Sequence, residues 1–551
     1  MRFGYLAVAF VYLLTLTIIP VNAQTAPAQA TQLKESYRGL TNPKAVSGVL
    51  PAAQHLADYV VDGKLTLSLR DAIILTLENN TQIRMNELQI ENEKYSLLRN
   101  YQPFDPSIIT SFNAQREVQQ SFTSLAGAST LSGLTQTGQI AYSQTFETGT
   151  NVQVSFNEVR SSTNSNFYFL NPYITSGLAF QFTQPLLRNR GLFPNRALIV
   201  IARRNLQQSR TVFEEQVNDA IQQAVAQYWT VILDSGNLDV QRKSLEEAEA
   251  SYKHDKRALE LGALSPLDIY RSESTVASRR VDVIQSEYAL KQQEDLLRLT
   301  IGADLDPYFR ALDLILTEKP EANGEMLNLD AATALQQAIA RRPELDGVRL
   351  ALANDSTSIR LAHNQLEPDL SLIGTYASNG LGGNQVDPTT GQVIATGGLG
   401  ASLNQLFGFA YPTYSATLTL TLPIKHRAAE AQLGNALVSR KQDLYTQRQL
   451  QERLTLEVSN AIHQLEQAKL SVAAANVSLD LAKKNLAAEQ RKYELGSETI
   501  FFVLDAQNQL AVAEQSLLQA QVGYQLSLAG VDHSTGSLLD HYHVQIAELS
   551  H

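Results

Sequence analysis

The chain carries one series of sequence landmarks twice, and this duplication limits which folds it can adopt. Residues 67–72 and 329–334 match at a spacing of about 262 residues, and a proline follows each segment at that same spacing. In each copy a capping residue, Ser68 or Asp330, opens a helix-like segment that the proline ends. The sequence therefore predicts two copies of one structural unit.

Later in each copy, apolar residues recur at every seventh position, about 234 residues apart between the copies. The two series are Ile269, Val276, Val283, Leu290 and Leu297, and Val503, Leu510, Leu517, Tyr524 and Val531. Such heptads predict long helices packed as coiled coil. Gly262 and Gly496 interrupt the helical pattern and predict the turn of a helical hairpin in each copy. Arms of 60 to 70 residues, over about 197–261 and 426–495, would span roughly 100 Å.

Between the helical segments, apolar and polar residues alternate, as in β-strands with one apolar face. The apolar positions are Val152, Val154 and Phe156, then Leu178, Phe180 and Phe182, then Leu418, Leu420 and Leu422. Strands of a membrane β-barrel, with lipid on one face and water on the other, have this pattern. Strands of a soluble sandwich have it too, so the alternation alone leaves both open.

The copies differ in length between their strands. Pro185 and Pro423 lie about 238 residues apart, so the first copy is about 24 residues longer in its strand region. Two alternating stretches over about 138–160, around Glu147-Thr148-Gly149, predict an added hairpin there. The second copy instead has a Gly- and Asn-rich segment between Ser378 and Phe409, which we expect to be an exterior loop.

The N-terminus predicts export. Arg2 precedes an apolar run over residues 6–19, and the small residue Ala23 before Gln24 marks a cleavage site, so residues 1–23 read as a secretory signal peptide. A retained signal anchor is the alternative. No later stretch reaches the roughly 18 apolar residues of a spanning helix. An exported chain of this kind is periplasmic, secreted or a β-barrel.

Composition excludes several classes of function. The formal net charge of −11 argues against a nucleic-acid partner. The absence of cysteine excludes a disulfide framework, a thiol nucleophile, a zinc–thiolate site and a lipidated cysteine. The sequence predicts no cofactor and no catalytic residue.

The order of helix, strands and long hairpin with a glycine turn, present twice, resembles the TolC-like outer-membrane factors (outer membrane efflux proteins). The resemblance covers about residues 64–539. The stretches that carry it are residues 67–80, 184–188, 342–345, 493–496 and 503–506. Each is weak alone, but together and in this order they are fairly specific.

The resemblance implies a mixed fold, in which all-α coiled coil joins a transmembrane β-barrel. Residues 24–63 would be an N-terminal extension. Residues 64–326 would form the first repeat, with strands over about 106–184. Residues 327–551 would form the second, with strands over about 368–423 and a short polar tail. The family also implies a homotrimer whose protomers each give four strands to one barrel and helices to a periplasmic tunnel.

By the same resemblance, the chain would be the outer-membrane channel of a tripartite efflux or type I secretion system and not an enzyme. Its partners would be a periplasmic adaptor, an inner-membrane pump and outer-membrane lipid. A surface or periplasmic coiled-coil structural or adhesive protein is the alternative, and it predicts no strands within the repeats. A metal-dependent enzyme, suggested by His533, His541, His543 and His551, is the weaker alternative, since no carboxylate constellation lies nearby in the sequence.

In this family the hairpin tips contact the adaptor. The corresponding residues are Leu261, Gly262, Ala263, Leu264 and Ser265 in the first repeat and Leu495, Gly496, Ser497, Glu498 and Thr499 in the second. Glycine suits the role because it lets backbone approach backbone. A plain helix-capping role would explain the same glycines.

The family's periplasmic gate maps onto Asp268, Tyr493, Phe502 and Asp505. Prototype members carry a basic residue two positions after the second tip glycine and an aspartate six after it. This chain has Glu498 and Phe502 there, so an aspartate–arginine latch between Asp268 and Glu498 cannot form. We expect an apolar constriction at Phe502 with Asp505 as an acidic ring, and ordinary coiled-coil packing is the alternative for Phe502.

Overall fold

The computed structural model describes residues 53–544, except residues 123–127, 166, 262–265, 305 and 321–328, and except the side chains of residues 266–268. The predicted signal peptide, most of the predicted extension, the first tip from Gly262 to Ser265, the side chain of Asp268 and His551 lie outside the described residues. Among the described residues, no helix has the length and apolar character needed to cross a bilayer.

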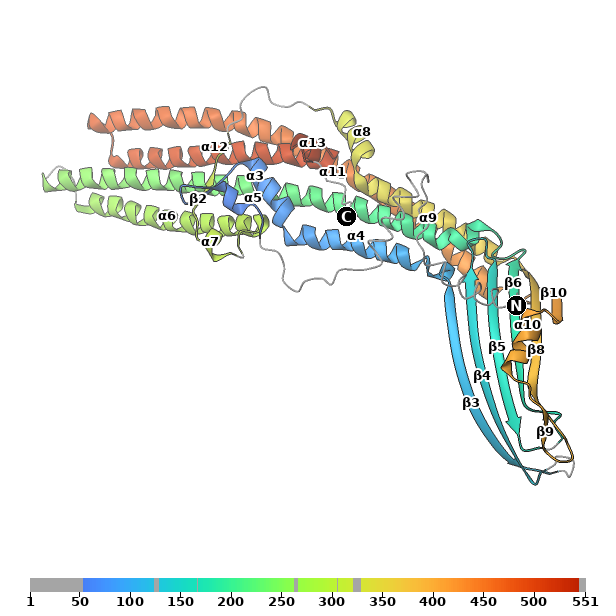
Figure 1. Ribbon diagram of the computed structural model, residues 1–551. Coiled ribbons are helices and arrows are strands. Elements are labelled where there is room, and N and C mark those ends of the chain that lie inside the picture. Colours follow the sequence, from blue (N-terminus) through green and yellow to red (C-terminus); the bar gives the residue numbers. More distant parts are fainter. Residues whose placement is uncertain are drawn as a thin grey trace, which may run out of the picture. The chain divides into compact units, whose positions relative to one another are not determined.

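The described residues form a set of long helices and one large sheet (Figure 1). The principal helices are α3 (Leu69–Asn79), α4 (Thr81–Arg99), α5 (Leu192–Glu260), α6 (Pro266–Ile301), α8 (Ala331–Arg341), α9 (Pro343–Gln365), α10 (Leu399–Phe407), α11 (Arg427–Glu494) and α12 (Ile500–Thr535). The short elements are η1 (Leu56–Tyr59), η2 (Gln102–Phe104), α7 (Pro307–Arg310) and α13 (Leu538–His541). A small sheet of order β1-β2-β7 joins β1 (Val60–Val61), β2 (Lys64–Leu67) and β7 (Leu314–Leu316).

The predicted capping residues open the helices as expected. The Ser68 side chain accepts a hydrogen bond from the Asp71 amide in a capping box, and Asp330 accepts one from the Thr333 amide. Each helix-like segment, however, contains two helices. Asn80 ends α3 and caps α4, while Pro343 occupies the first turn of α9, where its missing amide hydrogen costs no helical bond.

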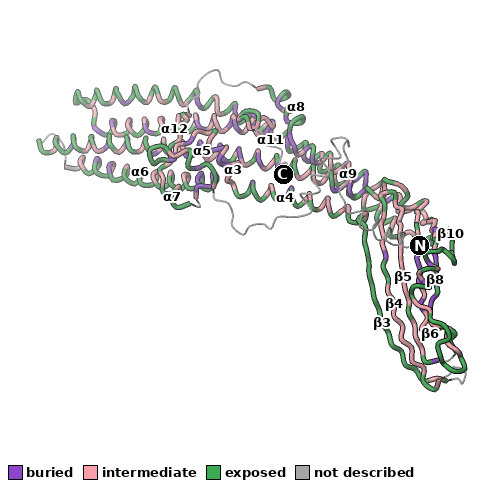
Figure 2. Tube along the Cα trace, in the orientation of Figure 1, coloured by how far each residue is buried: buried purple, intermediate pink, exposed green. Residues whose placement is uncertain are grey.

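The long helices pack in pairs, α5 with α6 and α11 with α12, and α5 also packs on α12. All ten predicted heptad residues are buried or half-buried. The largest core cluster surrounds Tyr228 and Trp229 of α5, whose rings meet edge to face. Figure 2 shows that the buried residues gather mainly along the helices. The heptads thus predicted the packing faces correctly.

The large sheet has the order β10-β8-β6-β5-β4-β3, with β9 paired to β8, and every long strand is antiparallel to its neighbours. Its strands are β3 (Ser107–Gln120), β4 (Thr130–Thr145), β5 (Asn151–Thr163), β6 (Leu170–Pro185), β8 (Asp369–Val386), β9 (Val393–Ala395) and β10 (Tyr411–Thr421). In sequence, α4 precedes β3, β6 precedes α5, α9 precedes β8, and β10 precedes α11. The helices therefore connect to one end of the sheet, which we call the helix-side end.

Two strand predictions need correction. The added hairpin exists, with its turn at Phe146–Thr150, but its strands β4 and β5 run over residues 130–163 and are full members of the sheet. The described part of the chain thus has six long strands in one sheet, where the resemblance implied four. The segment after Ser378 is also not a loop at first, because β8 continues to Val386.

The glycines of β8 explain why the segment after Ser378 was wrongly predicted to be a loop. A Cβ on Gly380 would lie 1.9 Å from the Ser402 carbonyl oxygen, and a Cβ on Gly382 would lie 2.3 Å from the Gly398 carbonyl oxygen. These glycines let α10 approach the strand, and they do not break it. A glycine-rich sequence is typical of loops, which is why the pattern misled.

Candidate functional site

The large sheet has one apolar and one polar face, and both extend across all six long strands. One row of paired residues is Ile108, Tyr142, Val154, Phe180, Tyr376 and Tyr414. The adjacent row is Ser107, Ser143, Gln153, Gln181, Thr375 and Ser415. The predicted apolar residues Val152, Val154 and Phe156 lie opposite Phe182, Phe180 and Leu178, so the alternation prediction is confirmed for β5 and β6.

Charge is sparse on the polar face. Among the residues of the six long strands, strand alternation places only Glu117 and Asp369 there, and Asp369 pairs with Arg188 at 2.5 Å at the helix-side end. The apolar face carries Arg116, Glu158 and Arg160, all toward the opposite end of the sheet. The polar face therefore carries mainly neutral hydroxyl, amide and small side chains, with a few apolar residues such as Ile109, Val159 and Ile373 among them.

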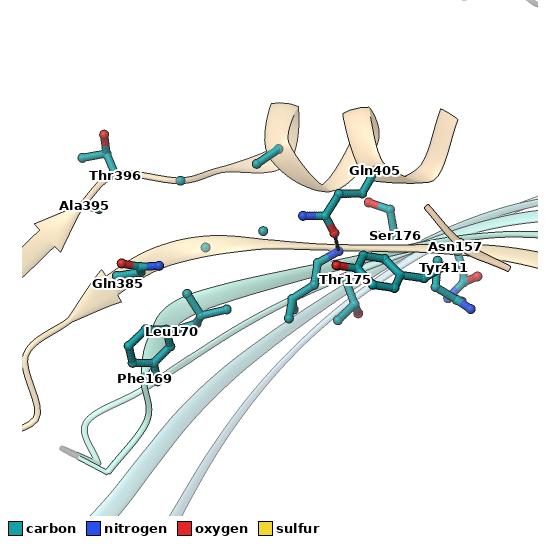
Figure 3. A pocket seen from close by; sticks show the side chains of 18 residues that line it. Asn157, Phe169, Leu170, Thr175, Ser176, Gln385, Ala395, Thr396, Gln405 and Tyr411 are labelled. Atoms are coloured by element: carbon teal, nitrogen blue, oxygen red, sulfur yellow. Dashed lines mark hydrogen bonds between the residues drawn. The ribbon is translucent and has the colours of Figure 1, made fainter. Parts of the chain in front are cut away.

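A cavity of about 810 Å³ lies where β8 extends past the end of β10 (Figure 3). The described residues that line it are all uncharged. The Gln405 side chain, from α10, accepts a hydrogen bond from the Leu381 amide at 3.0 Å and so occupies a bonding position on the open edge of β8. Ser402 donates to Ser176 at 2.8 Å, and Ser378 donates to the Leu406 carbonyl at 2.7 Å. These bonds hold α10 over β6 and β8.

The second helix-pair tip is fully described. Leu495 is the C-cap of α11 and is 68% exposed, and Gly496 has a φ of 69°. The Gly496 amide donates to the Tyr493 carbonyl at 2.9 Å and the Ser497 amide donates to the Lys492 carbonyl at 3.1 Å, which together form a Schellman turn. Among the residues that the structure describes, nothing lies within 4 Å of a Cβ built on Gly496. The glycine is thus a helix cap and also leaves an open surface at the tip.

The end of the first tip is only partly described, and Leu261 is its one described residue, at 84% exposed. The adaptor-contact role of both tips stays a prediction.

Near these tips, the structure places a buried carboxylate between the two helix pairs. Asp255 of α5 is fully buried and accepts hydrogen bonds from Ser272 of α6 and from the Tyr493 hydroxyl of α11, the latter at 3.4 Å. The His254 ring packs edge to face against Tyr493, with centroids 5.8 Å apart. Burial, followed by the Asp255 charge, raises the pKa of Tyr493 above its ordinary value. We call Asp255, Ser272 and Tyr493 the tip cluster.

Sequence reasoning selected Tyr493 but missed Asp255 and Ser272. A signal for Asp255 was present, because Asp255 lies seven residues after the buried Ala248 and so occupies a core position of the coiled coil. A carboxylate at such a position needs hydrogen-bonding partners, since burying an unpaired charge is costly.

Phe502 and Asp505 lie on the outer side of α12 in the single chain. Phe502 is 44% exposed, and its ring meets that of Phe501 edge to face, with the ring centroids 5.3 Å apart. The packed core at this end consists of other residues: Leu486, Ile500, Val503 and Ala506. Asp505 is exposed and accepts a hydrogen bond from Gln509 at 2.7 Å. The Arg271 guanidinium of α6 lies 5.3 Å from the Phe501 ring centroid. The constriction at Phe502 and the acidic ring at Asp505 stay predictions.

A second buried polar cluster joins α9, α11, α12 and α5. Arg342, 9% exposed, pairs with Glu344 and with Glu457, and donates to the His533 carbonyl at 2.9 Å. Burial alone would lower the pKa of His533, but hydrogen bonds to Asp219 and Glu457 raise it overall. Arg342 begins one of the stretches that carried the family resemblance, and its role here is to join four helices.

Two of the four histidines that suggested a metal enzyme have carboxylate partners in the structure. His533 contacts Asp219 at 2.9 Å, and His541 contacts Asp532 at 2.8 Å. Over the described part of the chain, no group of three or more metal-ligating side chains is found.

Comparison with known proteins connects this geometry to a family. Residues 334–537 match the family model described as outer membrane efflux protein. Outer membrane efflux protein BepC of Brucella suis biovar 1 is 22% identical over 378 residues, which are 68% of this chain and 76% of BepC. Pyoverdine export outer membrane protein OpmQ of Pseudomonas aeruginosa is 21% identical, and the match spans 53% of this chain but only 57% of OpmQ.

The fold agrees over a longer part of the chain. The solved structure of CusC superposes with a TM-score of 0.62 at 15% identity and covers 90% of this chain and 96% of that one. Residues 334–537 thus match the outer membrane efflux protein family, and nearly all of the chain shares the fold of a TolC-like outer-membrane factor.

Proposed function

We propose that the chain is the outer-membrane channel subunit of a tripartite efflux or type I secretion system, which conducts its substrates passively. The observation that carries this proposal is the two-faced sheet joined directly to long helix pairs. A sheet that is apolar on one face and neutral and polar on the other suits a barrel wall between lipid and water. The helices α5 and α11, each about 100 Å long, extend the conduit into the periplasm.

The alternative, a coiled-coil structural or adhesive protein, required repeats without strands. The six long strands between the helical segments argue against it. The family is one of transporters, and the chain acts without catalysing a reaction. Energy comes from a separate inner-membrane pump.

The working unit is a homotrimer. Six strands are fewer than the eight of the smallest bacterial barrels, so a single chain cannot close a barrel, and each copy supplies one part of the wall. The two helix-pair tips meet a periplasmic adaptor, and Gly496 leaves room there for a close backbone approach.

The tip cluster holds the periplasmic end of the tunnel closed. Tyr493 joins the second helix pair to a buried carboxylate of the first, so widening this end requires breaking that contact. This chain therefore replaces the aspartate–arginine latch of prototype members with a tyrosine–carboxylate contact at Asp255, supported by Ser272.

Planar-bilayer recording tests the channel function. The purified oligomer should give discrete ion-conducting steps without nucleotide, because a water-filled lumen needs no energy source to conduct ions. A preparation that inserts into bilayers and stays electrically silent, even with the tip cluster removed, would contradict the proposal.

A further inference from the structure

We propose that the hairpin β4–β5 widens the outer-membrane pore, so that three copies of this chain close an eighteen-stranded barrel in which β3 of one copy pairs with β10 of the next. Four strands per copy, as the family resemblance implied, would give twelve. This inference rests on the proposed channel function and names the interface through which the copies join.

The hairpin belongs to the wall. Residues 133–145 of β4 pair one by one with residues 151–163 of β5, and both outer sides of the hairpin pair with β3 and β6 without a break. Its alternation matches that of its neighbours: Tyr142 and Val154 lie in the apolar row, and Ser143 and Gln153 lie in the polar row. A hairpin folded away from the barrel would not need this match on both faces.

The two outer edges of the sheet suit each other. Within the described residues, β3 pairs only with β4, and β10 pairs only with β8. Both strands are exposed along their whole length, as Figure 2 shows for β3. Because six strands alternate in direction, β3 and β10 run antiparallel to each other, which is the direction that closure requires.

Lipid makes closure obligatory for these edges. Backbone amides and carbonyls without partners are too costly in the hydrocarbon region, so a membrane sheet has no open edge. The strand β10 has 11 residues and β3 has 14, so β3 is long enough to pair with the whole of β10. Beyond the end of β10, β9 pairs with β8, and Gln405 bonds to the Leu381 amide. The edge left for a partner is therefore β10 itself, and a second copy supplies the matching strand.

The wider barrel has a consequence for transport. Barrel diameter grows roughly in proportion to strand number, so eighteen strands give a bore about 1.5 times as wide as twelve. Among the described strand residues, the polar face that lines this bore has only Glu117 and Asp369 as charged residues. The outer-membrane segment of this channel would thus select little by size or charge, and selection would occur at the helix tips.

Cysteine cross-linking between copies tests the interface, and the natural absence of cysteine gives a clean background. Asn113→Cys in β3 is combined in turn with Ser415→Cys, Thr417→Cys or Thr419→Cys in β10, all on the polar face. Outer-membrane vesicles are oxidised and run on non-reducing gels. Gln139→Cys with Asn157→Cys, a facing pair within the hairpin, is the matched control and should close within one chain.

The proposal expects at least one of the three combinations to give a covalent ladder that ends at three copies, while each single variant gives at most traces. A bond within one chain between Asn113→Cys and either Thr175→Cys or Ala179→Cys of β6 would overturn it, because β3 would then lie beside β6 with the hairpin outside the wall. A ladder that ends at two or four copies, or no interchain product although the control pair closes, would overturn it as well.

Amine cross-linking of the unmodified protein separates this result from the proposed function. If the unmodified protein is cross-linked as a trimer in the outer membrane and the cysteine variants form the β3–β6 disulfide, only the eighteen-stranded barrel is refuted. A soluble monomer would refute the channel itself.

Discussion

Removing one hydroxyl from the tip cluster should open the channel measurably. Tyr493→Phe deletes the donor to the buried Asp255 carboxylate and leaves the ring in place. Hydrogen bonds to charged groups contribute about 1.5–3 kcal/mol. The donor–acceptor distance of 3.4 Å is long for such a bond, so the lower end of that range, about 1.5 kcal/mol, is appropriate. The closed state should therefore lose roughly tenfold in its equilibrium against the open state.

Open probability in planar bilayers measures this change directly. Because burial raises the pKa of Tyr493, the hydroxyl keeps its proton at neutral pH, and the effect should not vary between about pH 6 and 8. Tyr270→Phe is the matched control, since that tyrosine lies on α6 near the same tip but is 66% exposed. Ser272→Ala should act in the same direction, because it removes another donor to Asp255. An open probability that stays within twofold of the unmodified channel for Tyr493→Phe would refute the latch.

Three further outcomes follow from other parts of the chain. Gly496→Asp should abolish efflux or secretion at normal oligomer yield. Gly496→Asn also tolerates the φ of 69° but adds no charge, so it should retain more transport. Equal transport by both variants and by the unmodified protein would count against the tip as a contact site. Phe502→Ser should raise single-channel conductance by wetting the constriction, whereas Asp505→Asn should mainly reduce cation preference; the reverse pattern would mean an electrostatic gate. The pKa of His533 is raised in the folded protein, so the stabilisation that the protonated His533 provides should be complete below about pH 6.5 and be lost as pH rises through the folded-state pKa. His533→Gln should therefore flatten the dependence of the oligomer's melting temperature on pH over that window.

Much of the fold could be predicted from the sequence because the repeated patterns are local and periodic. The heptads identified the packing faces of α6 and α12, and Ser68 and Asp330 marked two helix starts, since each depends on residues only a few positions apart. The alternation in β5 and β6 was readable for the same reason. The length difference between the copies even located the added hairpin.

What the sequence could not supply depends on contacts between distant residues. The tip cluster joins Asp255, Ser272 and Tyr493 from three helices, and only the packing of the two helix pairs brings them together. The glycines of β8 suggested a loop because their purpose, the close approach of α10, becomes visible only when both segments are placed. The count of six strands likewise required the pairing of β4 and β5 with their neighbours, which neither strand's own sequence specifies.

The most direct test of the central claim is to map which residues of β6 face water and which face lipid. Single cysteines at Phe180, Gln181, Phe182 and Thr183 would be introduced into the cysteine-free chain and labelled in isolated outer membranes. Strand alternation predicts that a water-soluble maleimide labels Gln181→Cys and Thr183→Cys, and that only a lipid-dissolved reagent labels Phe180→Cys and Phe182→Cys. Recovery of the protein outside the outer membrane, or equal labelling of all four positions by the water-soluble reagent, would contradict the assignment of this sheet as a barrel wall.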